Sequence, residues 1–165
     1  MAERIFGFPP VARSDARVLI LGSMPSVESL RRSFYYAHPR NAFWPMMAEI
    51  LGEARPESIE EKAAMLTRHR IALWDTVESC ERAGSLDSAI RSARANDFAA
   101  FYGRCPEIRF VFFNGAAAEQ LYRRLVARRD DARSFFRLPS TSPAYTLRYE
   151  EKKAAWERAL KEAIE

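Results

Sequence analysis

The side chains best suited to chemistry in this sequence lie in two short segments, residues 22–44 and 138–145. The first segment places His38 and Asn41 within a run of aromatic residues, and the second is a loop of hydroxyl side chains with Pro139 and Pro143 at its ends. Aromatic rings can stack on a planar base, an amide can orient water, and hydroxyls can donate to phosphate. An amide has no useful basicity, so the pattern favours a reaction in which water is positioned rather than deprotonated.

Residues 34–44 (FYYAHPRNAFW) carry five aromatic side chains among His, Arg and Asn. Tyr36 is a candidate ring for stacking, and Asn41 is a candidate for positioning water. The alternative is an aromatic cluster that anchors the next helix, a role that we expect for Phe43 and Trp44. Two interpretations of His38 stay open: it stabilises an anionic leaving group, or it braces the loop beside the following proline.

Four apolar segments that alternate with helices are expected to position these residues. The predicted strands are Val18–Gly22, 71–74, 108–113 and Ser134–Leu138. The predicted helices are Phe43–Leu51, Ile59–Arg68 with a capping box at Ser58 and Glu61, 96–104 capped by Asn96, 116–129 and 150–164. This order predicts one α/β domain over residues 1–165, a three-layer α/β/α sandwich with a central four-stranded, mainly parallel sheet.

A parallel sheet places its site beyond the carboxyl ends of its strands, and all four predicted strands end in small or polar residues. Those residues are Ser23 and Met24 in the loop 22–26, then Asp75, Asn114, and Ser140, Thr141 and Ser142. For Asp75 the alternatives are contact with a base edge, contact with a water, or capping of the next turn. Asp87 is expected to be a helix cap.

The composition bounds the classes of function. A net charge of +4 and a pI of about 9.3 favour an anionic partner such as nucleic acid, although an arginine-rich composition also has this effect. Two cysteines and two histidines predict no disulfide framework and no metal site. The sequence lacks the phosphate-binding and dinucleotide fingerprints, so we expect no nucleotide cofactor. It also lacks an apolar run long enough for a membrane span, and its first ten residues do not have the pattern of a signal peptide. We therefore expect a cofactor-free, cytoplasmic monomer.

The segments GSMPS (22–26) and YAHPRNAFW (36–44) resemble motif 1 of the uracil-DNA glycosylase superfamily, and LPSTSPA (138–144) resembles motif 2, a loop that presses into the DNA minor groove. Together with GSLDS (84–88), they are most similar to the hypoxanthine-DNA (deoxyinosine) glycosylase branch. The resemblance extends from about residue 18 to residue 156. It implies a monofunctional glycosylase that removes deaminated bases from DNA, with hypoxanthine as first substrate and uracil in mismatches as second.

The resemblance also implies roles for individual residues. It assigns Tyr36 to stacking on the flipped base and Asn114 to its edge, because an amide matches the carbonyl and adjacent N–H that uracil and hypoxanthine share. Asn41, with His38, is the candidate for catalysis. Ser23, Met24 and Asp75 are candidates for base binding, and Ser140, Thr141, Ser142 and Tyr145 are candidates for DNA binding, with Tyr145 as a wedge.

One position departs from the family pattern. Met24 stands where many members carry Asp or Asn for water activation, and a thioether can do neither task. This departure leaves open a non-catalytic DNA-binding module on the same fold. A uracil- and mismatch-specific glycosylase is a separate alternative, and a small-molecule hydrolase or nucleotide-binding protein is a more remote one. The lysines at 62, 152, 153 and 161 are separated from the motifs in sequence, so no Schiff-base nucleophile is expected.

Overall fold

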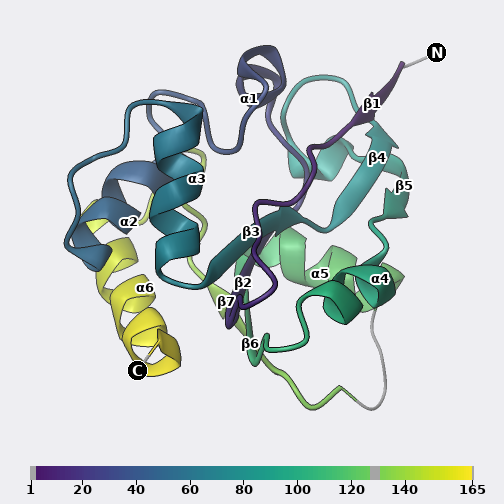
Figure 1. The fold of residues 1–165 in the computed structure, drawn as a ribbon. Coiled ribbons are helices and arrows are strands. Elements are labelled where there is room, and N and C mark those ends of the chain that lie inside the picture. The colour runs from purple at the N-terminus through teal and green to yellow at the C-terminus, as the bar shows by residue number, and fades with distance from the viewer. Residues whose placement is uncertain (1–2, 127–130, 165) are drawn as a thin grey trace.

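A computed structural model describes residues 3–126 and 131–164 and contains two β-sheets (Figure 1). The larger sheet has four parallel strands in the order β3-β2-β6-β7. These strands are β2 (Val18–Gly22), β3 (Ile71–Asp75), β6 (Phe110–Asn114) and β7 (Ser134–Leu138). The predicted four-stranded parallel sheet is confirmed, with strand ends that differ by one or two residues at most.

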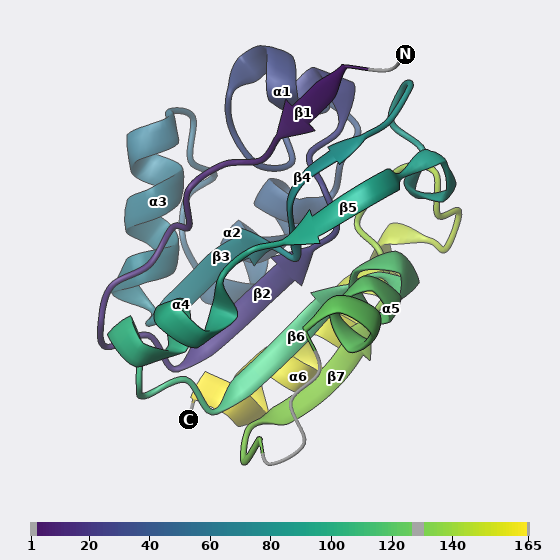
Figure 2. The same ribbon diagram turned by 90° about the vertical axis from the view of Figure 1, so that its right-hand side faces the viewer.

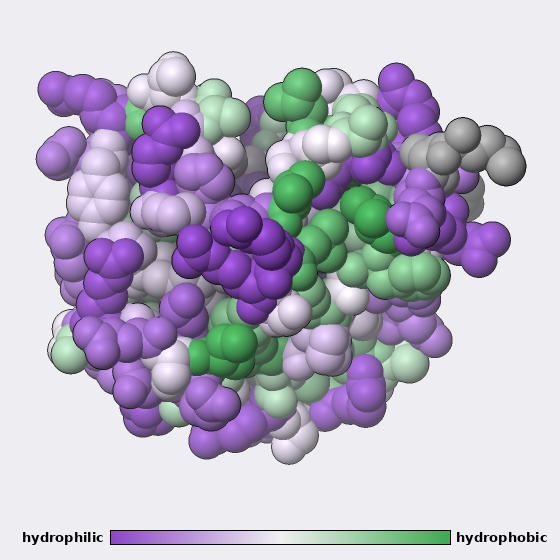
Figure 3. Space-filling model, turned by 90° about the horizontal axis from the view of Figure 1, so that it is seen from above, coloured by the Kyte–Doolittle hydropathy of each residue, from purple (hydrophilic) through white to green (hydrophobic). Residues whose placement is uncertain are grey.

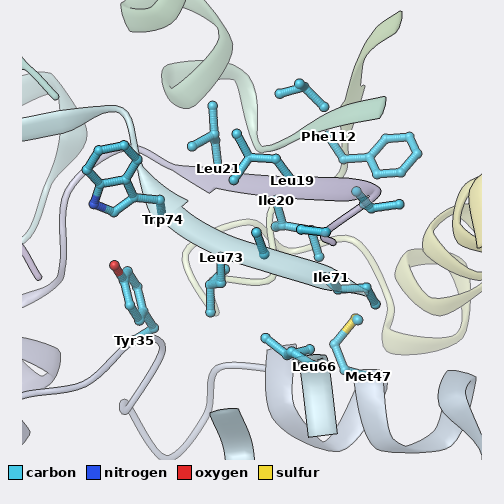
Figure 4. Packing of buried hydrophobic residues seen from close by; sticks show 14 of the residues in the cluster. Leu19, Ile20, Leu21, Tyr35, Met47, Leu66, Ile71, Leu73, Trp74 and Phe112 are labelled. Atoms are coloured by element: carbon cyan, nitrogen blue, oxygen red, sulfur yellow. The ribbon is translucent and has the colours of Figure 1, made fainter. Parts of the chain in front are cut away.

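The central strands form because their residues are apolar on both faces, as a sheet covered on two sides requires. Every residue of β2 and β3 is buried, and Leu19, Ile20 and Leu73 are fully excluded from solvent. Figure 4 shows Ile20 and Leu73 on the face of the sheet toward Leu66 and Met47 of the helical layer, with Leu19 on the opposite face. The sheet is therefore a rigid base for the loops that leave its carboxyl edge.

Helices cover both faces of this sheet, so the predicted three-layer sandwich is confirmed (Figures 1 and 2). One face carries α2 (Phe43–Leu51), α3 (Ile59–Arg68) and α6 (Tyr149–Ile164), and the other carries α4 (Phe98–Arg104) and α5 (Ala116–Leu125). Ser58 caps α3 as predicted, with its hydroxyl accepting from the Glu61 N–H at 3.0 Å. The Glu61 carboxylate accepts from the Glu57 N–H instead of the Ser58 N–H, so the box is only half formed.

A second, antiparallel sheet was not predicted. It consists of β1 (Arg4–Phe6), β4 (Val77–Glu81) and β5 (Arg91–Ala95), in the order β1-β4-β5. β5 has the sequence RSARA and no buried residue, so it has neither the apolar alternation nor the β-branched residues that indicate a strand. It forms because β4 offers it a partner across the sheet, which is a tertiary effect.

Several boundaries also differ from prediction. Asp97, not Asn96, caps α4, with its carboxylate accepting from the Ala100 N–H at 3.0 Å. The short helix α1 (Val27–Arg32) follows the first loop, where no helix was predicted. α5 ends at Leu125, and the end of the predicted helix 116–129 lies outside the described residues. No helix in the described part of the chain is long and apolar enough to cross a membrane.

Candidate active site

The carboxyl ends of β2, β3, β6 and β7 open into one pocket, here called the central pocket, at the edge of the sheet where the sequence places its candidates. The predicted residues that line it are Ser23, Met24, Tyr36, Asn41, Asp75, Asn114, Ser140, Thr141 and Ser142. His38 and Tyr145 do not line it. Figure 3 views the molecule from above, the side on which α1 lies, and shows a mostly hydrophilic face with apolar patches.

Asp75 and Tyr36 meet at the floor of the central pocket beside Gly22. The Asp75 side chain is buried, at 3% exposure, and its Oδ2 has no hydrogen-bond partner among the described residues. Burial, reinforced by the negative charge of Asp87 and opposed by Arg82, raises the pKa of Asp75 to about 7. The Tyr36 hydroxyl is likewise buried, and it interacts with the side chain of Asn114 across the pocket. A buried carboxyl oxygen that lacks a partner inside a pocket indicates a ligand that supplies one.

Position 22, between these two groups, has room only for glycine. A Cβ on Gly22 would overlap Asp75 Oδ1 and lie 2.8 Å from the Tyr36 hydroxyl. We expect Gly22→Ala to displace both side chains and to lower the rate of any reaction in the pocket by at least about tenfold, as misplacement of catalytic groups does.

Gly103→Ala is the matched control, because a Cβ there meets nothing within 4 Å and α4 gains a better helix former. Single-turnover rates and thermal unfolding of both variants provide the measurement. If Gly22→Ala is as active as Gly103→Ala, then Asp75 and Tyr36 do not form the floor of the reacting site.

Asn41 lies where the aromatic segment enters α2. Its Oδ1 accepts from the Phe43 N–H at 2.9 Å, so the carboxamide is held at the first turn of the helix. Its Nδ2 makes no hydrogen bond within the described ranges and remains available to a water in the central pocket. Phe43 and Trp44 are buried and anchor the helix, as predicted, and the Trp44 indole donates to the Tyr35 carbonyl at 2.8 Å.

Asn114 joins the end of β6 to the loop 139–144. Its Nδ2 donates to the Thr141 hydroxyl at 3.0 Å, and its Oδ1 accepts from the Thr141 N–H at 2.9 Å. The backbone N–H can only donate, so this pair fixes which end of the Asn114 amide is the donor. Thr141 is 1% exposed and therefore anchors the loop, whereas Ser140 and Ser142 are only partly buried.

Lysine side chains are closer to the motifs in space than they are in sequence. The Lys152 ammonium is nearly buried and donates to the Ser142 carbonyl at 3.0 Å, and the Trp156 indole donates to the Pro139 carbonyl at 2.8 Å. Lys62 lies over the Trp44 ring at 5.5 Å. No lysine is among the described residues that line the central pocket. Lys152 and Lys62 therefore contact the segments around the pocket and not its interior.

Met24 and Ser23 form the wall next to the Asp75 floor. Met24 is buried against Val77 and Leu121, so the thioether completes an apolar cluster at the position of the expected acid. Ser23 donates to the Asp87 carboxylate at 2.6 Å. Asp87 thus lines the pocket and is not the cap of its 3-10 turn, whose cap is Leu86. The GSLDS pattern was the available sequence signal.

His38 and Tyr145 lie on either side of the central pocket. His38 lines a neighbouring groove, and its Nδ1 accepts from the Arg40 N–H at 3.1 Å. Tyr145 follows the loop 139–144 and is 49% exposed, with the Lys152 ammonium 5.6 Å from its ring. The structure therefore does not bring His38 to the position of a leaving group in the central pocket, and it leaves Tyr145 accessible as a wedge.

The chain was compared with known proteins. Residues 9–164 match the family model of the uracil DNA glycosylase superfamily. A hypoxanthine DNA glycosylase of Methanosarcina acetivorans is 40% identical over 113 residues, covering 68% of this chain and 72% of the relative. A hypoxanthine DNA glycosylase of Methanosarcina barkeri is 32% identical over 156 residues, covering 94% and 97%.

A solved structure agrees with these relatives. It is the solution NMR structure of a Methanosarcina acetivorans protein named after the uracil DNA glycosylases, with 33% sequence identity and a TM-score of 0.82. The superposition covers 99% of this chain and 100% of the other. The matched family model spans the strands, the central pocket and the loops described above, and this chain belongs to the uracil DNA glycosylase superfamily.

Proposed function

We propose that this protein is a hypoxanthine DNA glycosylase, which hydrolyses the N-glycosidic bond of deoxyinosine in DNA and releases hypoxanthine. The observation that carries the proposal is the buried Asp75 carboxyl, which lacks a partner for Oδ2 in the pocket shared with Tyr36 and Asn41. The two Methanosarcina relatives named hypoxanthine DNA glycosylase support the choice of base.

Base recognition follows from the fixed polarity of Asn114. Its second N–H can donate to O6 of hypoxanthine, while its oxygen accepts from N1–H. Adenine presents the reverse pair, an amino donor beside an acceptor nitrogen, and a side chain locked by Thr141 cannot turn over to match it. Uracil presents the same pair as hypoxanthine through O4 and N3–H, which makes it the second substrate. Tyr36 supplies the stacking surface.

Departure of the base is assisted by Asp75 in its neutral form. When the glycosidic bond breaks, its electron pair leaves with the base, and the Asp75 O–H can donate to an acceptor atom of that anion. Its carboxyl group is protonated below a pH of about 7 because burial disfavours the charge. Water held by Asn41 then adds to C1′ and releases its proton to solvent, a weak nucleophile being sufficient for an oxocarbenium-like carbon.

The DNA strand is held by the loop 139–144. Ser140 and Ser142 can donate to phosphate, since Lys152, Trp156 and Asn114 hold the loop from beneath. Tyr145 fills the space that the flipped base leaves in the duplex.

The test uses end-labelled oligonucleotides with one deoxyinosine or one deoxyuridine, both single-stranded and in mismatched duplexes, followed by alkali. We expect alkali-dependent strand breaks at deoxyinosine. Breaks at deoxyuridine alone would show that the protein is a glycosylase but that hypoxanthine is not its substrate. A shifted band on DNA without breaks on any substrate would replace the enzyme with a DNA-binding module.

A further inference from the structure

A second hollow, here called the cationic groove, adjoins the central pocket. Its basic side chains are Arg32 at the end of α1, His38, Arg55 in the loop before α3, and Lys62 on α3. It shares Tyr36 and Asn41 with the central pocket, so the two hollows are continuous around these side chains. The groove has a volume of about 490 Å³ against about 110 Å³ for the central pocket, which suits an extended chain more than one base.

The positive charges in the groove are poorly compensated. Neither Arg55 nor Lys62 forms an ion pair within residues 3–126 and 131–164, while Arg32 lies 3.4 Å from Glu28. Burial, followed by the charges of Arg55 and Arg32, lowers the pKa of Lys62. An anion in the groove would offset the positive charges that line it, which indicates that the groove is arranged for one. Glu57 also lines the groove and is exposed, so it does not cancel three cations.

His38 adds a ring N–H donor to the same groove. Because its Nδ1 accepts from the Arg40 N–H, the neutral ring carries its proton on Nε2. No hydrogen bond to the described residues involves this Nε2, and the ring lines the groove. An imidazole N–H beside two guanidinium groups and an ammonium is a donor set that matches phosphate oxygens.

We propose that the cationic groove binds a phosphodiester group of the damaged DNA strand next to the flipped nucleotide. The proposal rests on the glycosylase function, because only a nucleotide held by Tyr36 and Asn41 brings its own backbone to the rim that both hollows share. His38 is then a phosphate-binding residue rather than a donor to the leaving base. The groove and the loop 139–144 hold the strand from opposite sides of the pocket.

The experiment measures fluorescence anisotropy of a duplex that carries 2′-fluoro-deoxyinosine, whose glycosidic bond resists hydrolysis, across a series of salt concentrations. For the double variant Arg55→Gln, Lys62→Gln we expect at least about tenfold weaker binding and a log–log salt slope smaller by about 2. The double variant Arg55→Lys, Lys62→Arg keeps both charges and is expected to recover most of the affinity.

The matched control is Arg104→Gln, Lys161→Gln. It removes the same charges from the ends of α4 and α6, which lie at the opposite edge of the sheet, and it is expected to bind like the wild type. If the control and the groove variant lose the same affinity, the effect is one of net charge and the groove is not a specific site.

A second arm distinguishes a strand phosphate from a free anion. Methylphosphonates replace, one at a time, the phosphates on either side of the lesion, and one of them is expected to weaken wild-type binding but not binding by the groove variant. Equal losses of affinity in the wild type and in the groove variant would overturn the proposal that the groove binds this phosphate. Competition by inorganic phosphate with no methylphosphonate effect would make it a free-anion site. If the wild type forms no abasic product, the glycosylase itself fails, which is a separate outcome.

Discussion

Asn41→Ala is expected to lower the single-turnover rate of deoxyinosine excision by about a hundredfold or more, because the attacking water loses the amide that orients it. The carboxamide is held at the start of α2 by the Phe43 N–H, with its Nδ2 free toward the central pocket. Affinity for the lesion should change much less, because the amide acts on water rather than on the base. The measurement is the rate at saturating enzyme, followed by anisotropy for the dissociation constant.

Loss of the hydrogen bond between the Phe43 N–H and the Asn41 side chain has to be separated from loss of water positioning. Ser58→Ala removes another side chain that accepts a backbone N–H at the start of a helix, the N-cap of α3, and is expected to cost about 1 kcal/mol of stability while leaving the rate unchanged. Asn41→Asp keeps an oxygen that can accept from the Phe43 N–H. A rate for Asn41→Ala within about threefold of that for Ser58→Ala would show that Asn41 only supports the start of α2, since positioned catalytic groups contribute far more than that.

Asp75→Ala is expected to reduce excision by about a hundredfold or more, because it removes the donor to the departing base. Since the pKa of Asp75 is raised to about 7, the wild-type rate should fall as the pH rises through that value and the carboxyl ionises. Asp75→Asn keeps an N–H donor at every pH. Its rate is expected to exceed that of Asp75→Ala and to lose this alkaline decline. A decline that persists unchanged in Asp75→Asn would assign it to another group.

The same shift predicts how stability depends on pH. The folded protein holds the Asp75 proton up to a pH of about 7, whereas the model value for an unperturbed Asp is 3.8, so the folded state binds more protons between these values. The free energy of unfolding therefore falls as the pH rises through this window. Urea unfolding at pH 8.5 should find Asp75→Asn more stable than the wild type by on the order of 4 kcal/mol, with little difference at pH 4. Equal pH dependence in both proteins would mean that Asp75 is not buried as a neutral acid.

The sheet and most of the helices could be predicted because their signals are local. The run 18–22 is apolar at every position, and Ser58 caps α3 through an atom three residues away. The candidate site followed from the same signals, because parallel strands bring their carboxyl ends to one edge. That rule alone brings together Asp75 and Asn114, which lie 39 positions apart in the chain.

The remaining features depend on contacts between distant segments. β5 is polar and forms only because β4 pairs with it. Asp87 lies at the pocket because its carboxylate accepts a hydrogen bond from the Ser23 hydroxyl, 64 residues away in sequence. Lys152 is ten residues from Ser142 in sequence, yet α6 brings it beneath that carbonyl. Sequence spacing carries no information on such contacts.

The sequence by itself determined the parallel sheet and the residues at its carboxyl edge through residue type and local periodicity, and it indicated the family through the resemblance of its motifs. Only the tertiary structure decided what those residues can do. It fixed the polarity of Asn114 through Thr141, and it moved His38 out of the central pocket. It also raised the pKa of Asp75 by burying it. The physical reason is that burial and electrostatic environment are set by every neighbouring segment together, and no local stretch of sequence contains them.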